Sequence, residues 1–391
     1  KKVMFFMKRN INLSKFFILI IILSFSISSF SFLVNAENSY HGSYTYFNYS
    51  MMKKALKFYK DILAKGGWET INKKEGLNEG NYGDNVFLLK KRLVMTNDLN
   101  PKMINDPQYY DNDLKKAVIK FQVRHGLETT GNVNKETLEE LNIPVEQRIK
   151  QIEYNIASMS NYTDKINNKY IIVNIPDFKL LIIEDNKVIM KMKTIVGTIG
   201  SKTPILNSKI TYLVINPDWN IPYRSSVIVI LPKIKNNPDY ITKNNIKVFK
   251  GWGKNSTEMN PDTINWSKIT INNFVYRFIQ KAGPLNPMGL VKFKFPNSYN
   301  VALHGTPNDN LFNEKYRAFS AGCIRIEKEI ELAKYIIGDM SSEEINKIIK
   351  NGKTKVVNLK KPIEIFWVYW TVWSTKDGTL HFRKDIYNKI K

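Results

Sequence analysis

The stretch "YIIVNIPDFKLLIIEDNKVIMKMKTIVGT", residues 170–198, decides the fold class of this chain. It contains three apolar runs of strand length, with an Asp-Asn pair between the second and the third. Short apolar runs bounded by Asn, Asp and Pro are typical of β-strands. The same pattern returns in "KITYLVINPDWNIP" (209–222) and "VKFKFPNSYNVALHGTP" (291–307). A mainly β domain is therefore expected over residues 165–391.

The rest of this domain is expected to add an insertion and peripheral helices. Residues 223–286 mix helix-like and loop-like sequence and predict a cap inserted over one face of the sheet. The segment 327–339 has helical spacing, and Ser341 forms a capping box with Glu344 at the start of a second helix. The tail "PIEIFWVYWTVWSTKDGTLHF", residues 362–382, reads as a hairpin that closes the sheet.

Upstream of the sheet the periodicity is helical. Residues 37–75 contain the amphipathic segment 51–68, a helix that a Gly-Gly pair ends. Residues 76–145 predict a small domain of three short helices, the first capped by Asp84 and the third beginning at Asn134. The predicted fold class is α+β: a small three-helix domain followed by a mainly β domain with peripheral helices and an inserted cap.

The first residues predict export. A basic segment, residues 7–15, precedes the uncharged apolar run 16–34, and Val-Asn-Ala ends at Ala36. This order is typical of a secretory signal peptide, so residues 1–36 are expected to be removed after Ala36. Because the run is nearly long enough to span a bilayer, an uncleaved membrane anchor is the alternative. In either case the protein is expected outside the cytoplasm, in the periplasm or cell wall.

The net charge is strongly positive, since 59 basic and 35 acidic residues give +24. Such an excess favours a polyanionic neighbour such as a cell wall, although a coding bias that scatters lysine over solvated faces explains it equally well. No basic cluster is interleaved with aromatic residues, so nucleic acid is not an expected partner. The single cysteine excludes a disulfide within the chain and marks a thiol that is a candidate for reactivity.

That thiol, Cys323 in "FSAGCIRI" (319–326), has neighbours that suit a nucleophile. A helix predicted from near Glu327 and the nearby Arg325 both stabilise a thiolate, which is the reactive form. Gly322 lets a substrate carbonyl come close, and the N–H groups of Gly322 and Cys323 can then point at a developing oxyanion.

The base expected for this thiol is His304 in "ALHGTP", nineteen residues before the cysteine, where a strand gives way to a turn. A lone cysteine or a lone histidine is usually structural. The two together, with Ser-x-Gly before the thiol and Ile-Arg after it, favour a nucleophile–base pair. No cluster of His, Cys and carboxylate residues has the spacing of metal ligands, so neither a metal nor another cofactor is expected.

The middle of the chain, "YYDNDLKKAVIKFQVRHGLETTGNVNKETLEELNIP" (109–144), resembles the peptidoglycan-binding domain found in many wall enzymes. The match rests on Y-D-x-x-L-x-x-A-V-x-x-F-Q-x-x-H-G-L, followed by G-x-V and T-L-x-x-L-N. It departs from the pattern at Thr130, where an acidic residue is usual. The resemblance implies that residues 76–145 bind the cell wall. His125 is then a structural residue at the end of a helix rather than a zinc ligand.

The motif around the thiol resembles a second family. H-G-T-P and, with fifteen residues between His304 and Ser320, S-x-G-C-I-R are similar to the active-site signature of the L,D-transpeptidases, whose catalytic domain is of the YkuD type. Stretches such as "IVGT", "AGPLNPMG" and "DGTLHFR" are similar to the large periplasmic subgroup, in which a peptidoglycan-binding domain precedes the catalytic one.

This second resemblance implies a reaction. Cys323 would attack the carbonyl of the third residue of a peptidoglycan stem peptide, release D-alanine and form a thioester, which the amine of a second stem resolves to a 3→3 cross-link. His304 would be the acid and base, held by the backbone carbonyl of Gly305. Inhibition by carbapenems is implied as well.

The resemblance also bears on four further positions. Ser320 is expected to hydrogen-bond within the motif beside the substrate, or else to be a plain turn residue. Arg325 is expected to hold a substrate carboxylate or, alternatively, to form a structural salt bridge. Trp219 matches an aromatic residue that lines the substrate groove, although a tryptophan between strands more often lies in the core. Ala302 stands where the subgroup often has a tyrosine, which leaves one wall of the pocket undefined.

Two other functions remain open at this point. Hydrolysis of the same thioester would make the protein an L,D-carboxypeptidase that trims tetrapeptide stems to tripeptides, with the same residues. A non-catalytic wall-binding protein would need the helical domain but no thiol–histidine pair. A sortase fits less well, because its signature places Thr-Leu-x-Thr before the cysteine.

Overall fold

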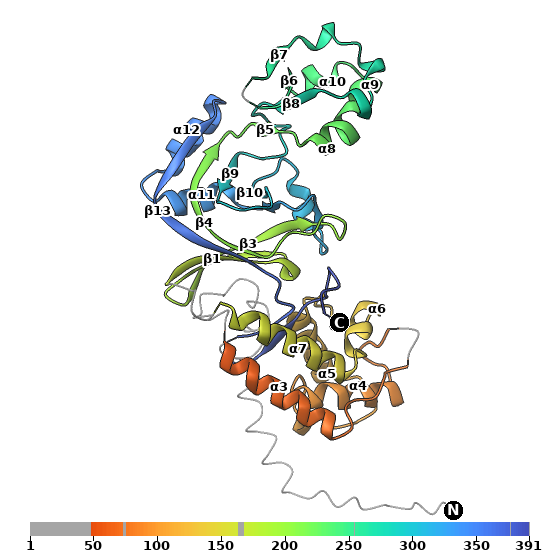
Figure 1. Ribbon diagram of the computed structural model, residues 1–391. Coiled ribbons are helices and arrows are strands. Elements are labelled where there is room, and N and C mark those ends of the chain that lie inside the picture. The colour runs from red at the N-terminus through yellow and green to blue at the C-terminus, as the bar shows by residue number, and fades with distance from the viewer. Residues whose placement is uncertain (1–47, 73–75, 163–167, 254, 376, 391) are drawn as a thin grey trace, which may run out of the picture. The chain divides into compact units, whose positions relative to one another are not determined.

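The computed structural model describes residues 48–72, 76–162, 168–253, 255–375 and 377–390 (Figure 1). The predicted signal peptide, residues 1–36, lies outside the described residues. Within them, no helix is both long and apolar enough to cross a bilayer. Residues 44–391 belong to one compact unit, in which a small helical domain precedes a mainly β domain with peripheral helices. The expected α+β class is therefore confirmed.

The β domain is a nine-stranded sheet that closes on itself. Its strand order is β11-β3-β12-β10-β9-β4-β13-β1-β2, and β2 pairs with β3 as well, so that β11 alone lies outside the closed ring. The strands are β1 (Lys169–Asn174), β2 (Lys179–Glu184), β3 (Lys187–Gly197), β4 (Leu206–Ile215), β9 (Val291–Lys294), β10 (Leu303–His304), β11 (Ala318–Ser320), β12 (Ile324–Ile326) and β13 (Lys355–Val368).

The first three strands follow the apolar runs of residues 170–198, as predicted. The turn between β2 and β3 lies at Asp185 and Asn186, whose φ angles are 49° and 61°. Two successive residues at positive φ are the mark of the tight hairpin turn that matches the twist of its strands. Asn and Asp tolerate this conformation better than other non-glycine residues, which explains why this pair occurs here.

The closed sheet holds the main hydrophobic core. Ile171 and Val173 of β1 point into it, together with Leu303 and Ile324 beside the predicted site, and all four are fully buried. Residues that alternate with these face the other side of the sheet, because successive side chains of a strand point to opposite faces. On β1 those residues are buried as well, so this part of the sheet is covered on both faces.

The outer cover consists of two helices, α3 (Tyr49–Ala64) and α7 (Val145–Ser160), which share a second core with the sheet. The helix predicted within 51–68 is confirmed as α3. The helix α7 was not expected. Its N-cap is Pro144. Proline suits a helix start because its missing N–H would have no partner there.

The helical domain has a core of its own beneath α4 (Asp84–Met95), α5 (Asn112–His125) and α6 (Lys135–Leu141). Asn134 caps α6 by accepting a hydrogen bond from the Thr137 N–H, as expected. Asp84 does not cap α4, because the N-cap is Gly83. The Asp84 carboxylate instead accepts a hydrogen bond from the Gln108 side chain.

The insertion is a subdomain with its own hydrophobic core, and its elements gather together in Figure 1. They are β5 (Trp219–Asn220), α8 (Tyr223–Ser225), a π-helical turn (Ser226–Ile230), α9 (Leu231–Asn236), α10 (Tyr240–Lys243), β6 (Ile246–Lys250), β7 (Thr257–Met259) and β8 (Tyr276–Gln280). The strands form a second sheet of order β5-β8-β6-β7. The predicted mixture of helix and loop is thus incomplete, because these strands are short and lack a clear apolar run.

The C-terminal elements correct one prediction. They are α11 (Glu329–Ile337), α12 (Ser342–Asn351), β13, β14 (Val372–Ser374) and β15 (Leu380–Phe382). The capping box of Ser341 and Glu344 is confirmed. The hairpin predicted over 362–382 is wrong in part: β13 enters the sheet between β4 and β1, whereas β14 and β15 pair with each other in a separate hairpin. Alternation of apolar and polar residues predicts that a segment is a strand. Which strand it pairs with depends on residues far away in the sequence.

Candidate active site

Two neighbouring strands bring the thiol and the histidine to one face of the sheet. β10 and β12 run parallel, with Leu303 opposite Ile324 and His304 opposite Arg325. The Ile324 N–H donates to the Ala302 carbonyl at 3.1 Å, which extends the pairing to the residue before each strand. Since Leu303 and Ile324 point into the core, His304 and the residues on either side of Ile324 face the opposite way. Cys323 and His304 therefore share a face.

The histidine is held in one tautomer. His304 is 2% exposed, and its Nδ1 lies 2.6 Å from the carbonyl oxygen of Gly305. A carbonyl can only accept a hydrogen bond, so Nδ1 carries the proton and Nε2 keeps a free lone pair. The expected orientation of His304 by the Gly305 carbonyl is confirmed.

The same histidine is neutral at neutral pH. Burial lowers the pKa of His304 to about 3; the bond to the Gly305 carbonyl opposes this shift, and the charges of Arg325 and Lys292 add to it. A neutral imidazole with a free Nε2 is able to accept a thiol proton.

The turn before the thiol is tied down by Ser320. The Ser320 hydroxyl donates to the Cys323 carbonyl at 2.5 Å and accepts from the Gly322 N–H at 3.1 Å. Ser320 is only 3% exposed, so its expected hydrogen bonding within the motif is confirmed. Its expected contact with substrate stays a prediction, and its donor and one acceptor position are used in the turn.

The oxyanion donors must be reassigned for the same reason. The Gly322 N–H is engaged by Ser320, and the Gly305 N–H donates to the Val291 carbonyl at 3.0 Å. Neither is free for a substrate oxygen. In the part of the chain that the structure describes, the Cys323 N–H has no acceptor, which makes it the remaining backbone donor at the thiol. Gly322 is still required as glycine, because its φ of 112° is strained for any other residue.

The charges around the thiol also differ from expectation. The helix α11 begins at Glu329, and β12 lies between it and the thiol, so a helix N-terminus does not flank Cys323. Positive charge comes instead from Arg325 and from Lys292, which lies opposite His304 on β9. Both cations interact favourably with Cys323, and burial lowers the pKa of each below its usual range. Lys292 was not identified from the sequence. The alternation in "VKFKF" predicts which face of the strand it lies on, but not that His304 lies opposite it.

Arg325 does not form the alternative structural salt bridge with any described residue. Among the described residues no carboxylate lies within 4 Å of Arg325 or of Lys292. The structure therefore fits a carboxylate-binding role for Arg325 better than a structural salt bridge.

A network behind the thiol contains further residues that the motif did not reveal. Thr203 donates from its hydroxyl to the Gly322 carbonyl at 3.0 Å and accepts from the Gly197 N–H at 2.8 Å. The Tyr387 hydroxyl donates to the Gly197 carbonyl at 2.6 Å and accepts from the Thr203 N–H at 3.2 Å. "IVGT" was noted as a resemblance, but its role as a support for Gly322 is visible only in three dimensions.

Three other predicted positions lie as follows. Trp219 is half-buried on β5 and packs against the core of the cap subdomain, and its expected place in a substrate groove stays a prediction. Ala302 is buried, next in the chain to Leu303 of β10. His125 is buried with its ring stacked between Phe121 and Phe382, and its Nδ1 lies 2.8 Å from the Phe121 carbonyl. The structural role expected of His125 is confirmed.

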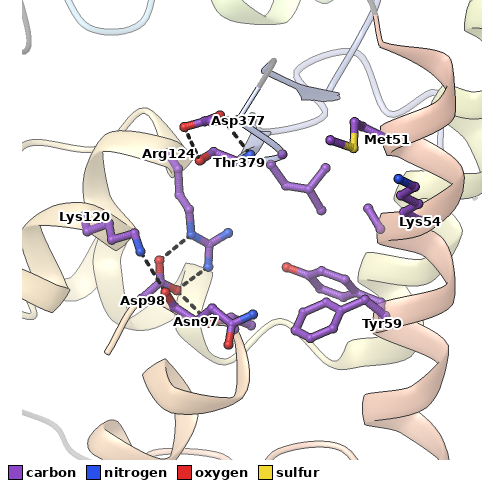
Figure 2. Close-up of a pocket in the computed structure, with 14 residues that line it drawn as sticks. Met51, Lys54, Tyr59, Asn97, Asp98, Lys120, Arg124, Asp377 and Thr379 are labelled. Carbon is purple, nitrogen blue, oxygen red and sulfur yellow. Dashed lines mark hydrogen bonds and ion pairs between the residues drawn. The ribbon is translucent and has the colours of Figure 1, made fainter. Parts of the chain in front are cut away.

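A cavity of about 360 Å³ lies elsewhere, between α3, the helical domain and the turn of the β14–β15 hairpin (Figure 2). On its wall the Arg124 guanidinium makes two hydrogen bonds to the Asp98 carboxylate, at 2.7 and 2.5 Å. Lys120 donates to the Asn97 carbonyl at 2.7 Å. These groups are engaged with one another, and the wall has no nucleophile–base pair. Among the described residues, no three His, Cys, Asp or Glu side chains converge as metal ligands.

Comparison with known sequences supports both resemblances. Residues 168–357 match the model of the YkuD family, the "L,D-transpeptidase catalytic domain", and residues 82–141 match the "Putative peptidoglycan binding domain". A "Putative L,D-transpeptidase" of Haemophilus influenzae is 37% identical over 219 residues. That alignment covers 56% of this chain and 44% of the relative, so the chain matches less than half the length of this relative.

Solved structures show more distant likeness. An L,D-transpeptidase from Stackebrandtia nassauensis is 15% identical, with 76% of this chain and 96% of that one covered and a TM-score of 0.26. The catalytic domain of the E. faecium L,D-transpeptidase acylated by ertapenem is 10% identical, with 52% and 98% covered and a TM-score of 0.21. The family assignment rests on the sequence matches and not on these superpositions.

Proposed function

The chain carries an L,D-transpeptidase catalytic domain behind a peptidoglycan-binding domain, and on that premise we propose that it joins peptidoglycan stem peptides by 3→3 cross-links through a thioester on Cys323. The observation that carries the proposal is the placement of Cys323 and His304 on one face of two paired strands. The proton on Nδ1 is fixed by the Gly305 carbonyl, so Nε2 is the nitrogen able to act as base.

The first half of the reaction forms the thioester. His304 Nε2 takes the proton of the Cys323 thiol, and the sulfur attacks the carbonyl carbon of the third residue of the donor stem. The developing oxyanion accepts a hydrogen bond from the Cys323 N–H. When the tetrahedral intermediate collapses, the C–N bond to the terminal D-alanine breaks. His304 then returns the proton to the leaving amine.

The second half transfers the acyl group. The side-chain amine of the third residue of another stem attacks the thioester carbonyl, and His304 Nε2 takes a proton from that amine. The C–S bond breaks, the thiolate leaves and is reprotonated by His304, and an amide joins the two stems. If water takes the place of the amine, the product is a trimmed tripeptide, which is the carboxypeptidase reaction. The same residues serve both outcomes.

The test uses purified residues 37–391 with disaccharide-tetrapeptides, and mass spectrometry to identify the products. We expect cross-linked dimers that lack one D-alanine, and their absence with Cys323→Ala and with His304→Gln. Tripeptide monomers alone would show a carboxypeptidase instead. If the Cys323→Ala protein made the same products as the unchanged one, the thiol mechanism would be refuted.

Two further proposals follow from the family. We propose that carbapenems acylate Cys323, which predicts a mass increase of one inhibitor molecule in the unchanged protein and none in Cys323→Ala. We also propose that residues 1–36 direct export to the periplasm or cell wall. Cell fractionation of the full chain beside a variant without residues 1–36 would test this, since cytoplasmic recovery of both would contradict it.

A further inference from the structure

Three strands place His304 between two cations. Lys292 of β9 pairs with His304 of β10 in the antiparallel direction, and Arg325 of β12 pairs with His304 in the parallel direction. Directly paired residues share a face of the sheet and lie within side-chain contact of one another. Lys292, His304 and Arg325 therefore form a row across the sheet, on the face that Cys323 shares.

Both ends of this row lack a carboxylate partner. Among the described residues, other buried cations have an acceptor: Arg124 pairs with Asp98 and Arg148 with Glu140, whereas Arg317 donates to backbone carbonyls. Lys292 and Arg325 are half-buried, yet no carboxylate lies within 4 Å of either among the described residues. A cation withdrawn from water is unfavourable unless an anion pairs with it, and here one stands on each side of His304. The row is thus an incomplete ionic site.

The thiolate itself does not satisfy this site through the reaction. It attracts both cations while it is free. Once the sulfur is acylated, the thioester is neutral and the two cations are again without an anion. A carboxylate carried by the donor peptide would pair with them before and after acylation. Such a group would be attracted in every state of the enzyme that holds the donor.

We propose that Lys292 and Arg325 together form a carboxylate-binding site for the donor peptide, with Lys292 as a specificity-determining residue. The identity of the donor rests on the proposed function, whereas the preference for an anion at the thiol does not. The planar Arg325 guanidinium is suited to two parallel hydrogen bonds with a carboxylate, and the Lys292 ammonium adds a point charge.

The first experiment needs no substrate. In the purified protein, residues 37–391, Cys323 is the single cysteine, and its alkylation rate is measured with iodoacetate and with the neutral iodoacetamide. In each case the thiolate displaces iodide and forms one S–C bond. Normalised to a free thiol in solution, we expect iodoacetate to be favoured several-fold. Lys292→Met should abolish most of that preference, and Lys292→Arg should retain it.

The control variant is Lys355→Met, an equal loss of charge at an exposed position of β13, which should leave the preference unchanged. If Lys292→Met slows both reagents by the same factor, the lysine acts only on the thiolate and the carboxylate site is refuted. An unchanged preference would refute it as well. Because retention of the preference in Lys292→Arg requires a folded site, that variant separates loss of charge from loss of structure.

A second experiment identifies the carboxylate. The tetrapeptide donor is compared with the same peptide whose terminal carboxylate is an amide, in the unchanged protein and in Lys292→Met. A rise in KM on Lys292→Met that is seen only with the acid assigns the terminal carboxylate. An equal rise with both assigns a carboxylate elsewhere in the donor, and no rise with either refutes donor recognition. Absence of turnover in every sample would count against the proposed function and would leave the alkylation result unaffected.

Discussion

At the scale of single residues, burial of the ionisable groups decides the chemistry. The pKa of His304 is about 3 because its ring is buried, and burial likewise lowers the pKa of His381 to about 3 and that of His125 well below its usual value. Each imidazole is neutral in the folded protein and becomes protonated in the unfolded chain below about pH 6.5.

This burial predicts that acid destabilises the protein. The unfolded state binds more protons than the folded one between about pH 6.5 and pH 3, so the contribution of these histidines is complete above about pH 6.5 and is lost as the pH falls toward 3. For His304 alone the loss is about 2 kcal/mol between pH 6.5 and pH 5. Urea unfolding at both pH values should show a smaller loss in His304→Gln. An equal loss in the two proteins would contradict the prediction.

Ser320 provides a second prediction at this scale. Its hydroxyl makes two hydrogen bonds inside the turn that carries the thiol, and Ser320→Ala removes both. We expect a loss of about 1–3 kcal/mol in unfolding free energy, because a buried N–H and a buried carbonyl lose their partner. Acylation of Cys323 should also slow by roughly 10-fold or more as the turn loosens.

The matched control for this change is Ser267→Ala, whose hydroxyl donates to the Asn265 side-chain carbonyl at an exposed site in the cap. It should change neither quantity measurably. Acylation is followed by mass spectrometry and stability by thermal unfolding. A Ser320→Ala protein that is destabilised but acylates at the original rate would show that the turn does not position the thiol.

At the scale of elements, two glycines let the segments around the site approach one another. A Cβ atom at Gly197, the last residue of β3, would lie 2.0 Å from the Ser201 carbonyl oxygen and 3.1 Å from the Gly322 Cα. A Cβ at Gly289, just before β9, would lie 2.4 Å from the Gly305 carbonyl carbon. The loops behind the thiol and the histidine are thus packed backbone to backbone.

Gly289 predicts how the histidine depends on this packing. Gly289→Ala would push the Gly305 peptide away and so disturb the acceptor of His304 Nδ1. We expect roughly 100-fold slower acylation of Cys323, together with a lower melting temperature. Gly378→Ala is the control, because its φ of 83° is also positive but its nearest neighbour, the Met51 methyl carbon, is at 3.8 Å.

The two variants share the backbone strain of a non-glycine residue at positive φ, which costs about 1 kcal/mol. They differ in the close contact. Equal acylation rates in both would mean that strain, and not displacement of the Gly305 carbonyl, accounts for the effect of Gly289→Ala.

At the scale of the molecule, the C-terminal segment links the helical domain with the closed sheet. The Arg383 guanidinium donates to the Asp177 carboxylate at 2.6 Å and to the Arg124 carbonyl at 3.2 Å. It also covers Gly126, where an added Cβ would lie 2.7 Å from its Nε. A little further on, Tyr387 reaches the network behind the thiol. The same short segment therefore contacts the helical domain and supports the turn that carries Cys323.

Arg383→Met should weaken this link. It withdraws the arginine that pairs with the buried Asp177 carboxylate, and Arg383 is the main cause that holds the pKa of Asp177 low against burial. We expect a loss of about 3 kcal/mol in unfolding free energy, or the splitting of one thermal transition into two as the domains unfold separately. Lys384→Met removes an exposed pair with Glu139 and should cost little. A single unshifted transition in Arg383→Met would refute the link.

Much of this protein can be predicted from short-range patterns. The strands of residues 170–198, the helices of the small domain and the shared face of Cys323 and His304 agree with what spacing and residue type predict. Such features depend on neighbours within a few residues, or on a reacting pair whose chemistry requires particular side chains.

The sequence by itself therefore determined the α+β class and pointed to Cys323 and His304 as the proposed nucleophile and base. Only the tertiary structure decided that Lys292 lies beside His304, that the Gly322 N–H is taken by Ser320, that β13 runs in the middle of the sheet, and that Tyr387 supports the catalytic turn. The positions of Lys292, β13 and Tyr387 depend on how segments that are distant in the chain pack and pair. The partner of the Gly322 N–H depends on which acceptor lies nearest to it in the folded chain. A shift of one residue in register would turn Lys292 into the core and Val291 or Phe293 toward the thiol.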